Sequence, residues 1–144
     1  MTKARVVAVC LSSQKGRKKV PLDRAFLRVG HGLEGDGHAG PWHRQVSLLA
    51  QESVDKMRAK GLEVGPGSFA ENLLTEGLDL VSLPIGTRLK VGVALLEITQ
   101  IGKECHDHCA IYRQVGDCVM PREGVFAKVL EGGEVKTGDP IERL

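Results

Sequence analysis

The stretch Thr87–Gln100, TRLKVGVALLEITQ, carries the longest strand pattern in this sequence of 144 residues. Its apolar residues alternate with polar ones or follow one another directly, which predicts one long β-strand. Near the start of the chain, the stretch Ala4–Leu11 is almost uninterruptedly apolar and predicts a strand buried on both faces. Shorter apolar runs at Arg24–Val29, Val46–Leu49 and Val125–Leu130 predict further strands.

One segment has the pattern of an amphipathic helix. Gln51–Lys60 places Val54 and Met57 three residues apart, on the same side of a helix, and Gly61 follows as a residue suited to the C-terminal end. The segment therefore predicts one clear α-helix with an inward face.

Turn residues separate nearly all of these segments. Leu83–Gly86 reads as a turn, and Gly132–Ile141 contains glycines around short apolar runs, which predicts a terminal hairpin. Many short strands, frequent turns and one clear helix favour a mainly β fold with a few helices, arranged as a β-barrel. The chain length and the absence of a long linker predict a single domain over residues 1–144.

The composition restricts the class of protein. Hydrophobic residues make up 42% and charged residues 26% of the chain, as in ordinary globular proteins, and the net charge is only +2. This small charge and five aromatic residues argue against a nucleic-acid partner. The apolar run Val6–Leu11 is too short for a signal peptide, and no stretch approaches the roughly 20 apolar residues that span a bilayer. We therefore expect a cytoplasmic protein without a membrane partner, in which the basic run Lys15–Lys19 forms an exposed turn.

Three of the four cysteines lie in one short segment, which is the strongest indication of chemistry. Cys10, the fourth, falls in the apolar first strand and is expected to be core. The segment reads Gly102-Lys103-Glu104-Cys105-His106-Asp107-His108-Cys109, and Cys118 follows. Clustered thiols in a reducing compartment indicate metal binding or reactivity rather than disulfides.

Several interpretations of this segment stay open. Cys105 is a candidate nucleophile or soft-metal ligand, because cations such as Lys103 or a protonated His106 would lower the pKa of its thiol. A tetrahedral zinc set of four side chains is the alternative, although its spacing differs from that of common structural zinc motifs. In a third interpretation the thiols are buried and carry no chemistry. The zinc alternative would use Cys105, His108, Cys109 and Cys118.

A glycine-rich stretch precedes a cluster of basic residues. Gly30–Gly40 contains five glycines and two histidines, so it predicts a shaped loop. Backbone N–H groups around Gly37, together with His38 and the nearby Arg44, could receive an anion. The other interpretation is a loop whose histidines are solvated.

Two polar residues follow a turn and precede an apolar pair. Asn72 is suited either to capping the backbone or to presenting a donor and an acceptor to a heterocycle such as a pterin. Its neighbour Glu71 is a candidate acid or base.

The motifs taken together resemble those of the MOSC domain, the molybdenum cofactor sulfurase C-terminal domain, in a short stand-alone bacterial-type form. The resemblance covers nearly the whole chain in the expected order. Its motifs are Gly35–Gly40, Arg44–Leu49, Phe69–Leu73, Leu83–Gly86, Gly102–Cys105 and Val125–Leu130 with the tail to Asp139.

This resemblance implies a β-barrel of the pyruvate-kinase type and a functional cysteine, matched by Cys105, that carries sulfur or ligates molybdenum. It implies that the molybdenum cofactor, a molybdopterin, contacts Asn72 through its pterin. The phosphate of the cofactor would then contact His38 and Arg44, near Gly37 and Glu71. No lysine has the setting of a pyridoxal-phosphate site, so a cysteine desulfurase partner is expected to supply the sulfur.

The expected function is delivery of sulfur from a persulfide on Cys105 to the molybdenum centre of a molybdoenzyme, or to a cofactor-biosynthesis protein. Whether the chain is itself an enzyme stays open, as a sulfurtransferase or as a molybdenum-dependent reductase component. Such a component would ligate the cofactor through Cys105 and act on N-hydroxylated compounds. A zinc-stabilised binding domain without catalysis is the remaining alternative.

Overall fold

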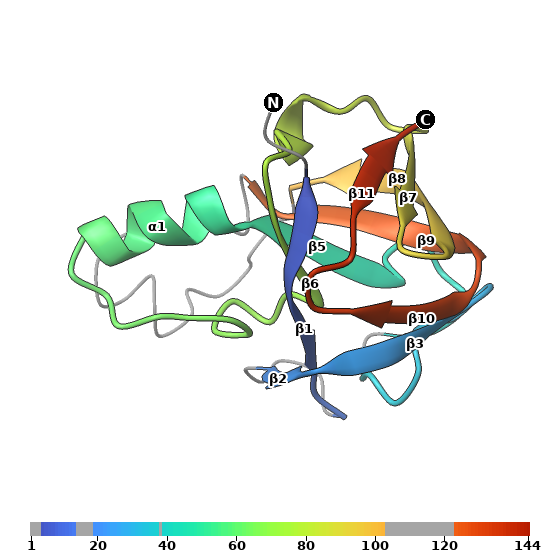
Figure 1. The fold of residues 1–144 in the computed structure, drawn as a ribbon, viewed down its shortest axis with the longest axis horizontal. Coiled ribbons are helices and arrows are strands. Elements are labelled where there is room, and N and C mark those ends of the chain that lie inside the picture. Colours follow the sequence, from blue (N-terminus) through green and yellow to red (C-terminus); the bar gives the residue numbers. More distant parts are fainter. Residues whose placement is uncertain (1–3, 14–18, 38, 103–122) are drawn as a thin grey trace.

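A computed structural model describes residues 4–13, 19–37, 39–102 and 123–144, which form two β-sheets, one α-helix and one short 3₁₀ helix (Figure 1). The larger sheet has eight strands in the order β11-β7-β8-β9-β5-β6-β1-β2, and the smaller has the order β10-β3-β4. The elements in chain order are β1 (Arg5–Leu11), β2 (Val20–Leu22), β3 (Arg24–Arg28), β4 (Gly32–Leu33), β5 (Val46–Ala50), α1 (Gln51–Ala59), β6 (Leu73–Glu76), η1 (Leu80–Ser82), β7 (Arg88–Val91), β8 (Ala94–Ile101), β9 (Val125–Glu131), β10 (Gly133–Lys136) and β11 (Ile141–Arg143).

The prediction of a mainly β fold is confirmed, but a closed barrel is not. The two ends of the larger sheet approach each other, because Arg5 in β1 forms an isolated bridge with Pro140, just before β11. A single bridge does not continue the ladder, so the sheet stays open among the described residues.

The predicted long strand over Thr87–Gln100 is wrong in one respect. It is a hairpin in which β7 pairs with β8 and Val91 lies opposite Ala94. The connection is Gly92-Val93, and Gly92 has a φ of 58°, which glycine adopts readily. The alternation of apolar and polar residues continues through this short turn, so the pattern alone could not reveal it.

The predicted terminal hairpin is also wrong. Strand β10 pairs with β3 in the smaller sheet, whereas β11 pairs with β7 at the edge of the larger one. The turn residues after Lys136 therefore carry the chain from one sheet to the other.

The helix prediction is confirmed. Val54 and Met57 are fully buried, and the N–H of Gly61 donates to the Arg58 carbonyl at 3.0 Å with a φ of 94° at Gly61. This left-handed residue ends α1 in the way glycine allows. No helix in the described part of the chain is long and apolar enough to cross a membrane.

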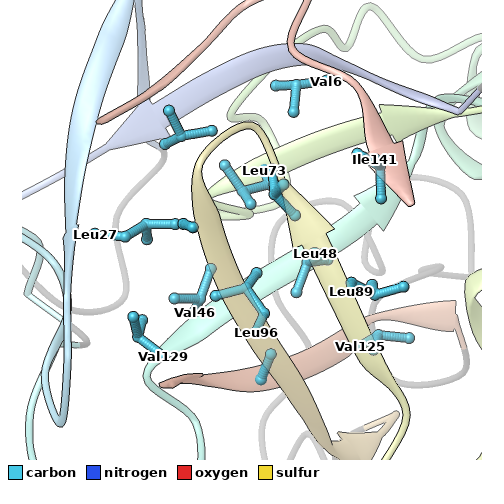
Figure 2. Packing of buried hydrophobic residues seen from close by; sticks show 14 of the residues in the cluster. Val6, Leu27, Val46, Leu48, Leu73, Leu89, Leu96, Val125, Val129 and Ile141 are labelled. Atoms are coloured by element: carbon cyan, nitrogen blue, oxygen red, sulfur yellow. The ribbon is translucent and has the colours of Figure 1, made fainter. Parts of the chain in front are cut away.

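The core has two layers, one on each face of the larger sheet. On the inner face, side chains from many strands converge, as Figure 2 shows for Val46, Leu48, Leu96 and Val129. A second cluster on the outer face packs β-strand residues against α1. Within β9, Val125 and Ala127 belong to the inner cluster and Phe126 to the outer one. The outer face is the one that carries the polar groups described next.

Candidate functional site

A row of side chains on the outer face of the larger sheet comes from four strands and from the residue just before β6. The strand register pairs Gln100 with Phe126 and Phe126 with Ser47. Backbone hydrogen bonds then link Asn72 to Ser47 and Cys10 to Asn72. Because paired residues project to the same face, these five side chains lie along one end of that face. Basic and acidic residues of the adjoining loops flank the row.

Asn72 is fully buried and bound to its neighbours in the row. Its Oδ1 accepts from the backbone N–H of Ser47 at 3.0 Å and from the Ser47 hydroxyl at 3.2 Å. Its Nδ2 donates to the Cys10 carbonyl at 3.2 Å. These contacts are those of a residue that locks β1, β5 and β6 together, so contact with a pterin stays a prediction.

Glu71 is also fully buried, with its carboxylate turned back on its own loop. Its two oxygens accept from the N–H groups of Gly67, at 2.8 Å, and Phe69, at 3.2 Å. Burial raises the pKa of this carboxyl above its usual value, and the backbone donors and Lys19 oppose that shift only in part. Glu71 thus shapes the loop before β6.

Lys19 is buried, which corrects its predicted place in an exposed basic turn; residues 15–18 lie outside the described part of the chain. Its Nζ lies 2.6 Å from Oδ1 of Asp36, and both side chains are 0% exposed. Asp36 Oδ1 also accepts from the N–H of Ser12 at 3.2 Å. The ion pair explains the burial, since a buried charge requires a partner. Nothing in the local pattern indicated this pair, because its residues are 17 positions apart.

Cys10 is confirmed as a core residue. Burial, with the charge of Glu71 acting in the same direction, raises the pKa of its thiol to about 12, and Lys19 lowers it only in part. A thiol in this setting stays protonated and unreactive at neutral pH.

The glycine-rich loop directs several of its N–H groups toward its own chain. The N–H of Gly37 donates to the Ser12 carbonyl at 2.7 Å, and that of Asp36 to the Leu33 carbonyl at 3.1 Å. The N–H of Gly40 donates to the His31 carbonyl at 2.7 Å. The prediction that this loop receives an anion therefore depends on side chains rather than on these N–H groups.

Arg44 packs against two aromatic rings. Its guanidinium lies 4.7 Å from the centre of a Trp42 ring and 5.6 Å from that of Phe126. The Nε atom is buried, and it has no hydrogen-bond partner among the residues that the structure describes. The aromatic rings hold the group in place, so an oxyanion could satisfy a donor that the described residues leave unpaired.

The segment with Cys105 leaves the described fold after Gly102 and rejoins it just before Phe126, the residue that Arg44 contacts. The N–H of Gly102 donates to the Gly124 carbonyl at 2.6 Å, so both ends of the segment meet at one point. The adjoining Gln100 contacts Gly102 and His43, and it was not identified from sequence because a strand glutamine has no distinctive pattern. Several predicted site residues lie outside the described part of the chain: His38, Lys103, Cys105, His106, His108, Cys109 and Cys118.

A hollow of about 310 Å³ lies near the start of α1. Ser53 and Lys56 line it, and both contact Oε1 of Glu123, at 2.7 and 3.0 Å. Of the predicted cofactor-binding residues that the structure describes, none lines this hollow. Among the described residues, no three His, Cys, Asp or Glu side chains are grouped to hold a metal ion, and the proposed zinc set lies outside them.

Comparisons with known proteins agree with the sequence motifs. The family model described as "MOSC domain" matches residues 35–142. The crystal structure of the YuaD protein from Bacillus subtilis superimposes with a TM-score of 0.74 at 21% identity, over 97% of this chain and 94% of that one. YiiM from Geobacillus stearothermophilus gives a TM-score of 0.73 at 19% identity, over 98% of this chain and 75% of that one. YiiM from Escherichia coli gives 0.70 at 22%, over 100% and 70%. No curated protein sequence matches the chain.

Proposed function

The chain belongs to the MOSC domain family, and from this premise we propose that it binds the molybdenum cofactor and carries sulfur on Cys105. The family is commonly linked to that cofactor. The observation that carries the proposal is Arg44, whose aromatic-flanked guanidinium has a buried Nε without a partner among the described residues and lies at the sheet end from which the segment with Cys105 departs. The proposal is therefore that an anion bound at Arg44 lies at the end of the sheet where the segment with Cys105 begins.

The residues present suit the phosphate of a molybdopterin. A planar guanidinium binds phosphate oxygens through two parallel N–H donors, and the stacked rings reduce the entropy lost on binding. When bound, the cofactor would supply the molybdenum centre that receives sulfur. In this proposal His38 adds charge beside Arg44, Asn72 and Glu71 shape the floor next to Gly37, and Lys103 and His106 favour the thiolate of Cys105.

The sulfur-carrying step is a thiol–persulfide exchange. The Cys105 thiolate attacks the terminal sulfur of a persulfide on a cysteine desulfurase, the sulfur–sulfur bond of the donor breaks, and the donor leaves as a thiolate. Release of that sulfur as sulfide takes two electrons, which an external dithiol supplies as it becomes a disulfide. Cys105 returns to the thiol.

Intact-mass measurement after incubation with a cysteine desulfurase and cysteine tests the sulfur-carrying step. Wild-type protein and the Cys109→Ser control should each gain the mass of one sulfur atom, and Cys105→Ser should gain none. An equal gain in Cys105→Ser would contradict the proposal. Metal analysis of the same protein separates the alternatives, since stoichiometric molybdenum favours a reductase component and stoichiometric zinc a zinc-stabilised binding domain.

Phosphate binding tests the role of Arg44 separately. Inorganic phosphate, titrated while amide resonances are followed, should shift those of residues 42–44 in wild-type protein. Arg44→Gln should weaken this binding by about tenfold, the usual effect of a charge-assisted hydrogen bond. Arg88→Gln on exposed β7 serves as the control. Equal affinity in Arg44→Gln and wild type would remove Arg44 from the site.

A further inference from the structure

The outer face of the smaller sheet carries an exposed aromatic residue at its centre. Phe26 lies in the middle of β3, the central strand, and is 52% exposed, whereas its neighbours Ala25 and Leu27 belong to the inner core cluster. Alternation along the strand therefore turns Phe26 away from the core. Single exposed apolar residues are common on protein surfaces, so the meaning of this one depends on what surrounds it.

Four charged side chains surround Phe26 in a regular pattern. Arg24 and Arg28 come two residues before and after it on β3, so they lie on the same face along the strand. On the neighbouring strands, Glu134 of β10 is paired with Phe26, and the N–H of Glu34, just after β4, donates to the Phe26 carbonyl at 2.9 Å. The two positive charges therefore follow the strand, and the two negative charges lie across it. These five residues are called the Phe26 face below.

Ion pairs within the chain agree with this arrangement. One Nη of Arg24 lies 3.8 Å from Oε2 of Glu134, and one Nη of Arg28 lies 3.8 Å from Oε1 of Glu34. Both distances are long for an ion pair, and the four side chains are between 36% and 69% exposed. Exposed pairs of this kind contribute little to stability, so each charge can take a new partner with little loss.

We propose that the Phe26 face binds the same face of a second copy of the chain, with the two β3 strands crossing at about a right angle. Positive charges on one arm of a cross and negative charges on the other match a copy that is turned in this way, whereas strands packed along one another would oppose like charges. Arg24 of each protomer then meets Glu34 of the other. Arg28 meets Glu134 in the same way, and the two Phe26 rings meet on the two-fold axis.

The position of Lys136 distinguishes the two possible right-angled arrangements. Lys136 of β10 is paired with Arg24, so it occupies one corner between the arms of the cross. The alternative arrangement, in which Arg24 meets Glu134 of the other protomer, places Lys136 opposite its own copy, and like charges that meet across an interface repel. The proposed arrangement separates the two lysines, so the charges favour it.

Sedimentation velocity of the full chain from about 10 μM to about 1 mM tests for the dimer, because a face of this size forms only a weak interface. Wild-type protein should shift from monomer toward dimer over this range. Phe26→Ser should raise the Kd of the dimer by about tenfold or more, as expected for an aromatic residue at the centre of an interface. Lys90→Glu, on an exposed position of β7, changes the net charge as much as Arg24→Glu does and should leave the Kd unchanged.

Charge reversal in two separate variants tests which residues meet. Arg24→Glu and Glu34→Arg should each raise the Kd by about tenfold or more, because each opposes like charges across the interface. An equimolar mixture of the two should regain most of the wild-type affinity, since the introduced carboxylate of one protein meets the introduced guanidinium of the other. A mixture of Arg24→Glu with Glu134→Arg should not, because the proposed arrangement does not bring these positions together.

Circular dichroism establishes that each variant is folded, so a lost dimer reports on the face itself. Wild-type protein that stays monomeric at about 1 mM overturns the inference, whatever else the Phe26 face binds. So does a folded Phe26→Ser protein with the wild-type Kd. A mixture of Arg24→Glu and Glu34→Arg that associates no better than either protein alone also overturns it.

Discussion

The buried ion pair between Lys19 and Asp36 gives the sharpest test of the energetics of this fold. Lys19→Met removes the cation and leaves the Asp36 carboxylate 0% exposed, with the N–H of Ser12 as a remaining donor. Removing one partner of a buried pair costs about 3–5 kcal/mol, because the other charge stays desolvated without compensation. For a chain of this length, about 2–4 °C of melting temperature corresponds to each kcal/mol, so we expect a fall of roughly 6–20 °C.

A double variant separates the cost of an uncompensated charge from the loss of packing. In Lys19→Met/Asp36→Asn both sites are neutral, and the asparagine Oδ1 can still accept from Ser12. The double variant should therefore be more stable than Lys19→Met alone, recovering at least about half of the loss. Chemical denaturation with circular dichroism measures the free energy of unfolding of each protein.

An exposed pair on the smaller sheet provides the control. Arg24 lies 3.8 Å from Glu134 with 69% of its side chain exposed, so Arg24→Met should change the stability by less than about 1 kcal/mol. If Lys19→Met is as mild as Arg24→Met, or if the double variant shows the sum of the single losses, the reasoning about the buried pair is wrong.

Three further predictions concern the same region. Because burial raises the pKa of Glu71, the folded protein keeps the proton on this carboxyl to a higher pH than the unfolded chain does. The free energy of unfolding should therefore fall as the pH rises above the ordinary carboxyl pKa of about 4.3 and through the raised pKa of Glu71. Glu71→Gln should flatten that fall in urea denaturation measured from pH 4 to pH 8, and an unchanged slope would refute the assignment. The Cys10 thiol, with a pKa of about 12 and no exposed surface, should react with iodoacetamide only after denaturation; labelling of native protein at Cys10 would contradict its burial. Gly67→Ala should cost at least about 2 kcal/mol, because a Cβ there would meet the Lys19 carbonyl oxygen at 1.9 Å and φ is +84°, whereas Gly86→Ala, with φ of +94° and nothing within 4 Å, should cost about 1 kcal/mol by thermal unfolding. Equal losses would show that close approach at Gly67 is not what requires glycine.

The parts of the fold that depend on local pattern were predictable from the sequence. The first strand, the helix and the burial of Val54, Met57 and Cys10 follow from periodicities that act within a few residues, and the structure confirms them. The hairpin at Gly92 was missed because two strands joined by two residues keep one alternating pattern. The partners of β10 and β11 were missed because pairing between distant strands leaves no local pattern.

The candidate site likewise has features that the local sequence predicts and features that depend on contacts between distant residues. Arg44 was identified from residue type within a basic cluster, whereas its stacking on Phe126 depends on strands that meet across the sheet. The charge run around Lys19 predicted a solvated turn, because its partner Asp36 lies in another loop. Long-range contacts of this kind are decided by topology and not by local composition.

The polar groups on the outer face fall into two sets with different consequences for a ligand. Asn72 and Glu71 make their hydrogen bonds within the chain, so a ligand at either would first have to replace bonds whose loss costs about 1–3 kcal/mol for each group left unsatisfied. Arg44, in contrast, holds a buried donor that has no partner within the described residues, so a ligand there gains a bond without breaking one. The first set fixes the positions of β1, β5 and β6, and the second lies where the chain departs toward Cys105. The same physical chemistry thus favours Arg44 over Asn72 and Glu71 as the position for an anion.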